Sequence, residues 1–203
     1  MEDKEVRFLS EKLLIDEYIK GVLSNEIITS QKIKLACERH INDLKKMGTE
    51  SFPWVFDERK AFRPVKFIEM FCAPSKGDYI KLEMQPWQHF VIGSLYGWVH
   101  KDTGIRRFKE GLILLGRKNG KSTMVSGLAN YGCSKDGENG ADVHLLANSM
   151  KQARVIFDEC TKMIKASPWL NSEFRTLRDA IHYDETFSKI EPQASDSERL
   201  DGL

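Results

Sequence analysis

The sequence predicts an α/β fold in which helices flank a parallel sheet. Three observations support this prediction. An apolar run at residues 112–115 is typical of a buried strand, and apolar residues at helical spacing follow it after a polar turn. A second apolar run at residues 143–147 predicts a parallel strand that is reached through that helix. Helical periodicity in residues 3–47 predicts helices ahead of this unit.

Composition is that of an ordinary globular protein, with 41% hydrophobic and 30% charged residues. A formal net charge of +1 gives no global basic field, so overall charge does not predict nucleic-acid binding. The start of the chain lacks the pattern of a signal peptide, and no apolar run has the length of a membrane span. The cysteines are far apart and form no Cys-x-x-Cys pair, which predicts buried thiols in a reducing compartment and no metal site.

Residues 1–50 are predicted to form an N-terminal helical extension, and residues 51–203 the main domain. Within the extension we expect a second helix to begin near Ser30 and to end just before Gly48. Pro64 is predicted to be the first residue of a further short helix, because proline suits that position.

The most basic local patch of the sequence surrounds this proline. Its cations could contact DNA phosphates. A solvated helix face is the interpretation that we favour, since charge runs are usually solvated. The patch consists of Arg59, Lys60, Arg63 and Lys66.

Residues 116–123 have the layout of a phosphate-binding loop. Gly120 has no Cβ, so its backbone can approach a phosphate closely. The N-terminus of the following helix would present N–H groups and the positive end of its dipole to an anion. Lys121 would place a positive charge against the β- and γ-phosphates of a nucleotide, and Ser122 would offer its hydroxyl to Mg²⁺.

The loop departs from the usual pattern in its first half. The motif has a glycine five positions before Gly120, where this chain has Leu115. Gly116 comes one residue later, and Arg117 lies inside the loop. The alternative is an ordinary strand–turn–helix that happens to contain Gly-Lys-Ser. We favour phosphate binding, because the predicted strand and helix flank the loop as the motif requires.

Gln88 is a candidate adenine-binding residue upstream of the loop. It ends a Gln-Pro-Trp-Gln run, in which Pro86 suits the first turn of a helix. A side-chain amide offers both a donor and an acceptor, which can match the edge of adenine. Trp87 could pack beside the base. The run is weak evidence alone and gains weight from the loop that follows it.

Two acidic pairs further along the chain have different interpretations. Asp158 and Glu159 follow an apolar run and resemble the end of a Walker B strand, whose carboxylates hold Mg²⁺ and activate water. The surrounding apolar residues have helical spacing, however, so we interpret this pair as lying on a helix. Asp184 and Glu185 are predicted to form the turn of a β-hairpin. Residues 192–198 are predicted to be a polar loop.

Taken together, these motifs resemble the large subunit of the terminase of tailed bacteriophages, the ATPase that drives DNA into a capsid. An arginine inside the loop is characteristic of that family's variant P-loop. Two N-terminal stretches, at residues 18–24 and 36–40, also resemble the family, so the similarity covers nearly the whole chain. The remaining similar segments are Gln-Pro-Trp-Gln at 85–88, Gly-Arg-Lys-Asn-Gly-Lys-Ser-Thr at 116–123, Ala-Asn-Ser-Met-Lys-Gln-Ala at 147–153 and the ending at 195–203.

The resemblance implies a RecA-like P-loop sheet with ATP and Mg²⁺ as cofactors. It implies catalytic roles for Lys121 and for Arg117, the latter as a sensor of the γ-phosphate, and it implies Ser122 as the magnesium ligand. Gln88 would bind adenine. The remaining nucleotide contacts would come from the loop, which comprises Gly116, Arg117, Lys118, Asn119, Gly120, Lys121, Ser122 and Thr123.

The same resemblance implies partners and a location. The partners are double-stranded DNA, the terminase small subunit and the portal protein, with further copies of the chain as a possible homo-oligomer. No membrane is involved, and the setting is the cytoplasm of the bacterial host cell.

The sequence stops before the position at which the family has its Walker B strand and, later, a metal-dependent nuclease domain. Loss of general-base help costs on the order of 10²–10⁴-fold in rate. We therefore expect this N-terminal piece to bind nucleotide and to hydrolyse it poorly. We also expect an open sheet edge or exposed apolar surface, through which the chain could pair with itself.

Two alternatives remain at this point. One is a helicase-like P-loop translocase, which shares the layout of glutamine and P-loop. The other is a non-catalytic DNA-binding or assembly module that acts through the N-terminal helices and the basic patch. DNA binding that is sensitive to salt and survives the loss of Lys121 would favour the second.

Overall fold

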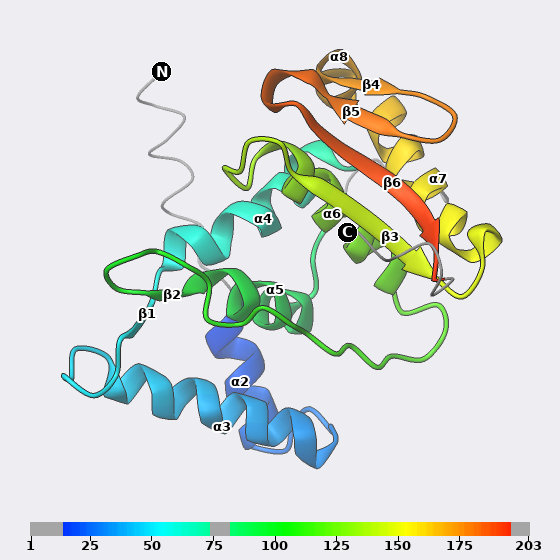
Figure 1. Cartoon of the computed structure of the whole chain (residues 1–203). Helices are drawn as coiled ribbons and strands as arrows, with labels where there is room; N and C mark the ends of the chain where they lie inside the picture. Colours follow the sequence, from blue (N-terminus) through cyan, green and yellow to red (C-terminus); the bar gives the residue numbers. More distant parts are fainter. Residues whose placement is uncertain (1–13, 74–81, 196–203) are drawn as a thin grey trace. The chain divides into compact units, whose positions relative to one another are not determined.

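The computed structural model describes residues 14–73 and 82–195 (Figure 1). The chain forms two compact units: Met1–Val65 with Met84–Leu112, and Lys66–Glu83 with Ile113–Leu203. The helix expected before residue 14, most of the turn expected at 73–78 and the family-like ending at 196–203 lie outside the described residues. The predicted domain boundary at residue 50 stays a prediction.

The first unit is mainly helical, with one short antiparallel strand pair. Strands β1 and β2 pair with Trp54 opposite His100. The unit boundary falls inside α4, whose last residues belong to the second unit. In chain order the elements are α2 (Ile15–Leu23), α3 (Gln31–Lys46), β1 (Trp54–Phe56), α4 (Glu58–Phe71), α5 (Pro86–Gly97) and β2 (Trp98–His100).

The second of the two predicted N-terminal helices begins and ends where the sequence predicts. Ser30 is the N-cap residue of α3, and Gly48 follows its end with a φ of +83°. Helices α2, α3 and α5 enclose a buried cluster to which α2 contributes most of the residues. The cluster consists of Ile15, Tyr18, Ile19, Val22, Cys37 and Phe90.

Helix α4 begins six residues before the proline that was predicted to start it, so that prediction is wrong. The carboxylate of Asp57 accepts hydrogen bonds from the backbone N–H groups of Arg59 and Lys60, at 2.9 and 3.1 Å. This N-cap fixes the start of the helix at Glu58. Pro64 lies inside the helix, where its ring removes one backbone hydrogen bond.

The second unit is a four-stranded mixed sheet with helices packed on it. The strand order is β3-β6-β5-β4, and only β3 and β6 are parallel. Helices α6 and α7 pack against each other and against β3 and β6 (Figure 1). The elements are α6 (Lys121–Ser134), β3 (Asp142–Ala147), α7 (Met150–Ala166), α8 (Pro168–Glu173), β4 (Phe174–Thr176), β5 (Ile181–Tyr183), the 3-10 turn η1 (Asp184–Thr186) and β6 (Ser188–Ala194).

The apolar run at residues 112–115 is not a strand, which corrects the prediction made from its composition. Leu112 and Leu114 are 84% and 79% exposed. A strand requires a neighbour for its ladder of backbone hydrogen bonds, and among the described strands β3 pairs only with β6. The parallel crossover therefore joins β3 to β6, and it does not join residues 112–115 to β3.

The predicted hairpin of β5 and β6 is confirmed, but its second strand runs further than expected. Residues 192–194 belong to β6 and pair with β3, where a polar loop was predicted. The pairing of β5 with β6 ends at Ile190, so the side of β6 that faces away from β3 is open at Pro192. The backbone N–H of Lys189 donates to Ala141 on the β3 side, which places the nitrogen of Pro192 on the open side.

The four cysteines are free and buried, as the sequence predicts. Burial raises the pKa of the Cys37 thiol to about 11 and that of the Cys160 thiol to about 12. Thiols with such pKa values are poor nucleophiles at neutral pH. None of the helices described here is long and apolar enough to cross a bilayer.

Candidate nucleotide-binding site

The loop at residues 116–120 is exposed and turns sharply before α6. Two of its residues have left-handed backbone conformations: Lys118 with a φ of +65° and Gly120 with a φ of +71°. The side-chain amide of Asn119 donates to the carbonyl oxygen of Arg117 at 3.4 Å. Left-handed residues in a turn allow successive N–H groups to line a concave anion site. The loop thus has a backbone suited to phosphate.

Gly120 is the N-cap residue of α6, a helix of 14 residues. Its carbonyl oxygen accepts the first helical bond, from the N–H of Met124 at 3.0 Å. The N–H groups of the first turn of α6, which come before Met124 in the chain, have no partner inside the helix. With the helix dipole they favour an anion at this end. Glycine is also favoured at position 120 because a residue with a Cβ would be strained in this left-handed backbone conformation.

The side chains expected to contact nucleotide surround this helix start. Arg117, Lys121 and Ser122 are exposed, and Thr123 is half-buried. Two cations and a hydroxyl at a helix N-terminus are suited to a polyphosphate and its Mg²⁺ ion. The described residues contain no cluster of three or more His, Cys, Asp or Glu side chains that could hold a metal ion.

Gln88 lies at the third position of α5, in the first unit, whereas the loop belongs to the second. It is buried, and its Oε1 accepts the backbone N–H of Gln85 at 2.7 Å. Pro86 is the first residue of this helix, as predicted. The oxygen of Gln88 therefore has a structural role as a helix cap, which leaves its amide N–H₂ as the group that could contact a base.

Asp158 and Glu159 lie in the middle of α7, as the helical interpretation predicts. They do not follow a strand and do not lie where the parallel strands β3 and β6 end. Ligands of α/β sheets gather at those strand ends. This pair is therefore not a Walker B pair.

Polar side chains that the sequence reasoning missed connect α6 to α7. Ser126 donates to the carbonyl oxygen of Ile156 at 3.3 Å, and Asn130 donates to that of Cys160 at 3.5 Å. Both donors are fully buried. Their spacing of four residues puts them on one face of α6 together with the buried Ser134, and this repeat of polar residues was the signal that the sequence offered. The helix that follows the loop is thereby fixed to α7.

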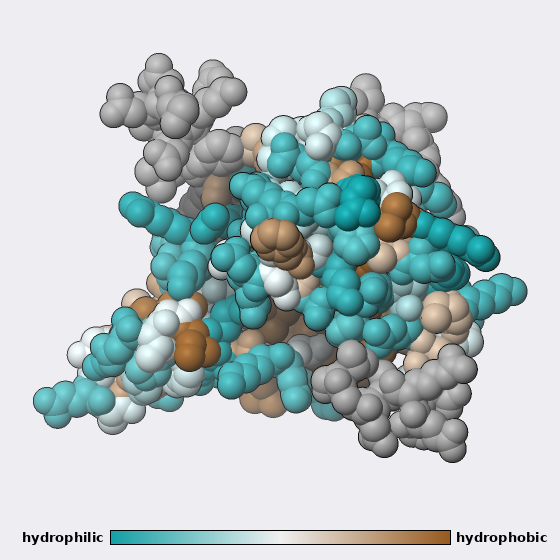
Figure 2. All heavy atoms as spheres, turned by 45° about the horizontal axis from the view of Figure 1, so that its top comes forward, coloured by the Kyte–Doolittle hydropathy of each residue, from teal (hydrophilic) through white to brown (hydrophobic). Residues whose placement is uncertain are grey.

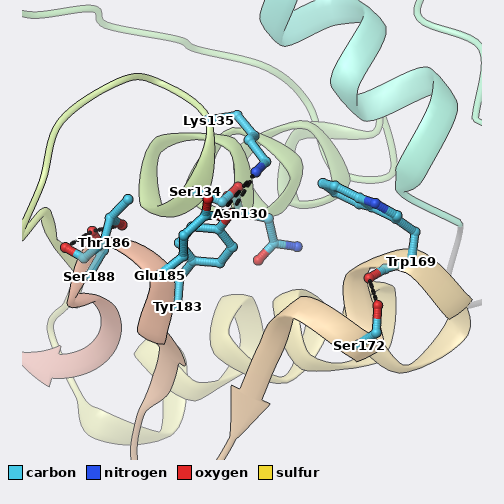
Figure 3. Close-up of polar contacts among 9 residues, drawn as sticks. All are labelled: Asn130, Ser134, Lys135, Trp169, Ser172, Tyr183, Glu185, Thr186 and Ser188. Carbon is cyan, nitrogen blue, oxygen red and sulfur yellow. Dashed lines mark hydrogen bonds and ion pairs between the residues drawn. The ribbon is translucent and has the colours of Figure 1, made fainter. Parts of the chain in front are cut away.

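The C-terminal end of α6 is held by a second polar group (Figure 3). Lys135 donates to the hydroxyl of Tyr183 at 2.5 Å and lies 3.5 Å from the carboxylate of Glu185. Its ammonium group also lies over the Trp169 ring, 5.3 Å from the centroid. Partial burial lowers the pKa of Lys135, but the hydrogen bond to Tyr183 and the attraction of Tyr183 and Glu185 outweigh burial and raise it. A permanent cation suits the negative end of the helix dipole.

Comparisons with known proteins agree with the sequence resemblance. A family model described as "Terminase large subunit, ATPase domain" matches residues 86–203. Terminase large subunits of Lactococcus phages p2 and SK1 are each 21% identical over 186 residues, which is 88% of this chain and 33% of theirs. The chain thus spans about a third of the length of these relatives. The crystal structure of the HK97 bacteriophage large terminase matches with a TM-score of 0.60 at 19% identity, over 71% of this chain and 29% of that one.

Proposed function

We propose that this chain, which belongs to the family of terminase large subunit ATPase domains, binds Mg²⁺-ATP through the loop at residues 116–123. The observation that carries the proposal is the start of α6, where left-handed Gly120 is followed by exposed Lys121 and Ser122. The α/β fold, which the likeness to a solved large terminase supports, is the RecA-like class expected from the sequence.

Each loop residue has a role in this proposal. Backbone N–H groups from Gly116 to Gly120 would surround the β-phosphate, with Lys118 and Asn119 shaping the turn. Lys121 would bind the β- and γ-phosphates, and Arg117 would respond to the γ-phosphate. Ser122 and Thr123 would complete the site, with the hydroxyl of Ser122 on Mg²⁺. These groups position charge and do not take part in covalent chemistry.

Gln88 is proposed to bind adenine through its amide N–H₂. Its Oε1 is occupied by the backbone of Gln85, so it has a donor to offer. Adenine presents a ring nitrogen acceptor on its Watson–Crick edge, whereas guanine presents a donor at the equivalent position. A donor at this place would therefore favour ATP over GTP.

Slow hydrolysis by the 203-residue chain is also part of the proposal. The Asp-Glu pair that resembled a catalytic pair lies within α7. Among the described residues, no Asp-Glu pair directly follows β3 or β6, and loss of a positioned general base lowers the rate on the order of 10²–10⁴-fold. ATP turnover at the rate of intact P-loop ATPases would contradict the proposal of slow hydrolysis.

The wider biological role follows from the family. We propose that the chain is part of a motor that uses ATP to move viral DNA into a capsid, in the cytoplasm of the bacterial host. Double-stranded DNA, the terminase small subunit and the portal protein are the proposed partners. The family match favours this role over a helicase-like translocase or a non-catalytic module.

A Ser122→Ala variant tests the loop assignment with and without metal. In Mg²⁺ the variant should bind ATP more weakly than the parent chain, because it lacks the hydroxyl ligand of the ion. In a chelator the two proteins should bind ATP equally. The assignment of Ser122 is wrong if the variant binds like the parent in both conditions. Ser172→Ala is the matched control for loss of a hydroxyl, because Ser172 is exposed in α8.

A further inference from the structure

Hydrophobic residues are scattered among hydrophilic ones on the face of the molecule shown in Figure 2. Single exposed apolar side chains are normal and indicate no partner. Polar side chains in the interior are more informative, because a polar group is costly to bury unless it has a hydrogen-bond partner. In the second unit such side chains lie between α7 and α6, the helix that carries the candidate loop at its start.

Buried side chains join α6 to α7 through hydrogen bonds to backbone carbonyls. Ser126 donates to the carbonyl oxygen of Ile156 at 3.3 Å, and Asn130 donates to that of Cys160 at 3.5 Å. In the opposite direction, the Cys160 thiol donates to the carbonyl oxygen of Ser126 at 3.6 Å. All three donor side chains are fully buried. We call Ser126, Asn130 and Cys160 the polar ladder.

The polar ladder fixes the axial position of α6 on α7. The two donors on α6 are four residues apart, and so are the carbonyls of α7 that accept their bonds, so the helices run in the same direction. A hydrogen bond is directional, and a bond to a backbone atom fixes one helix axis against the other. A buried polar group that loses its partner is costly. A displacement of α6 along its axis should therefore carry α7 with it.

We infer that the polar ladder transmits the presence of a bound nucleotide from the loop at residues 116–123 to α7. The inference rests on the proposed function, because a nucleotide is the ligand that would act on the loop. Phosphates bound at the first turn of α6 would restrain the helix at Lys121, and Ser126 follows less than two turns later. Ser126 and Asn130 are therefore positioning residues, which act on α7 from the interior of the unit.

Helix α7 is joined in turn to an exposed part of the sheet. The Arg154 guanidinium donates to the carbonyl oxygen of Arg178 at 3.1 Å and forms an ion pair with Asp179. Both partners lie in the turn between β4 and β5, which the N–H of Leu177 closes by donating to Ala180 at 2.8 Å. Because β5 is antiparallel to both β4 and β6, this turn lies at the sheet edge at which β6 ends. The β4–β5 turn is thus the surface at which the nucleotide state of the loop would be displayed.

The test is amide hydrogen exchange, followed by NMR, of the 203-residue chain with and without saturating Mg²⁺-ATP. In the parent chain ATP should slow exchange about fivefold or more in the first turn of α6, in α7 around Ile156 and at Leu177 in the β4–β5 turn. Ser126→Ala and Asn130→Ala should retain the slowing in α6 and lose it in α7 and in the turn. Arg154→Gln should lose it in the turn alone.

Ser134→Ala is the matched control for the loss of a buried hydroxyl from α6. Ser134 donates to the carbonyl oxygen of Asn130 within the same helix at 2.8 Å (Figure 3). Thermal melts of Ser134→Ala and Ser126→Ala should both show a modest loss of stability, whereas only Ser126→Ala should uncouple α7 from the loop. A merely structural role of Ser126 predicts the same exchange pattern in the two variants. Ser126→Ala removes one hydroxyl group, so it tests the ladder even if Asn130→Ala does not fold.

The inference is overturned if ATP slows exchange in α6 of the parent chain but not in α7. It is also overturned if Ser126→Ala and Asn130→Ala keep the full response of α7. A response of the β4–β5 turn that survives in both ladder variants would mean that the nucleotide contacts the turn directly, which again overturns the inference. If exchange in α6 itself does not respond to ATP, the proposed nucleotide site fails, and the inference fails with it.

Discussion

The indole N–H of Trp98 donates a hydrogen bond to Nδ1 of His40 over 3.1 Å, between two buried side chains. Phe56 and Phe90 meet the edge or face of the same imidazole, with ring centroids 4.9 and 6.0 Å away. A ring nitrogen that accepts a hydrogen bond carries no proton. His40 is therefore neutral, and it joins α3 to the start of β2.

This arrangement predicts that the first unit loses stability in mild acid. Burial lowers the pKa of His40 below its ordinary value of 6.5, although Asp16 and Asp43 oppose the shift. Between the lowered pKa and 6.5 the unfolded chain binds a proton that the folded chain does not. Stability should therefore be complete above pH 6.5 and fall below it, by at most about 1.4 kcal/mol per pH unit.

The measurement is chemical unfolding between pH 7.5 and pH 5 for the parent and His40→Gln. Glutamine retains an acceptor for Trp98 but does not titrate in this range. The variant should lose part of the slope of stability against pH. An unchanged slope would assign the acid sensitivity to other groups.

Gly127 in α6 should not tolerate a larger residue. A Cβ at this position would lie 2.8 Å from Cγ1 of Ile68, which is fully buried. Gly127→Ala should therefore destabilise the second unit by about 1–3 kcal/mol through overpacking. Gly132→Ala in the same helix meets its nearest atom at 4.0 Å and should stabilise by about 0.5–1 kcal/mol. Thermal melts of the two variants should move in opposite directions.

Gly120→Ala separates backbone strain from ligand binding. A side chain at its φ of +71° should cost about 1–2 kcal/mol of folding stability. Gly137→Ala carries the same kind of strain, at a φ of +96° in a surface turn with open space around the Cβ. Both variants should lose stability, but only Gly120→Ala should weaken ATP binding. Equal ATP affinity in the two variants would remove Gly120 from the site.

Gln88→Glu tests the adenine assignment without removing the helix cap. A carboxylate keeps the oxygen that caps Gln85 but lacks the amide donor. We expect a smaller preference for ATP over GTP, together with some loss of thermal stability, because Gln88 is buried and a carboxylate is costly to bury. If the preference is unchanged, Gln88 is a cap only.

Local signals in the sequence predicted the helices well. Ser30 and Pro86 fix the starts of α3 and α5, because capping and proline chemistry act within one turn. Pro64 is a misleading start signal for α4, because the capping carboxylate of Asp57 sets the start of the helix.

Long-range pairing could not be predicted in the same way. The run at residues 112–115 has the composition of a buried strand, but pairing depends on neighbours that composition does not specify. Pro192 favours a loop by its residue type, although it is tolerated in β6 at a position where β5 has ended. At the candidate site, the loop and Lys121 were predicted, whereas the bonds of Ser126 and Asn130 to α7 depend on packing and were not.

The most direct test of the proposed site is a calorimetric titration of Mg²⁺-ATP into the parent chain and into Lys121→Ala. Lys162→Ala, at an exposed position of α7, is the control for loss of a positive charge. The parent chain and Lys162→Ala are expected to bind ATP alike. Lys121→Ala should bind more than about tenfold more weakly, because a hydrogen bond to a charged group contributes about 1.5–3 kcal/mol. Equal binding by all three proteins, or binding by none, would contradict the claim that this loop is a working nucleotide site.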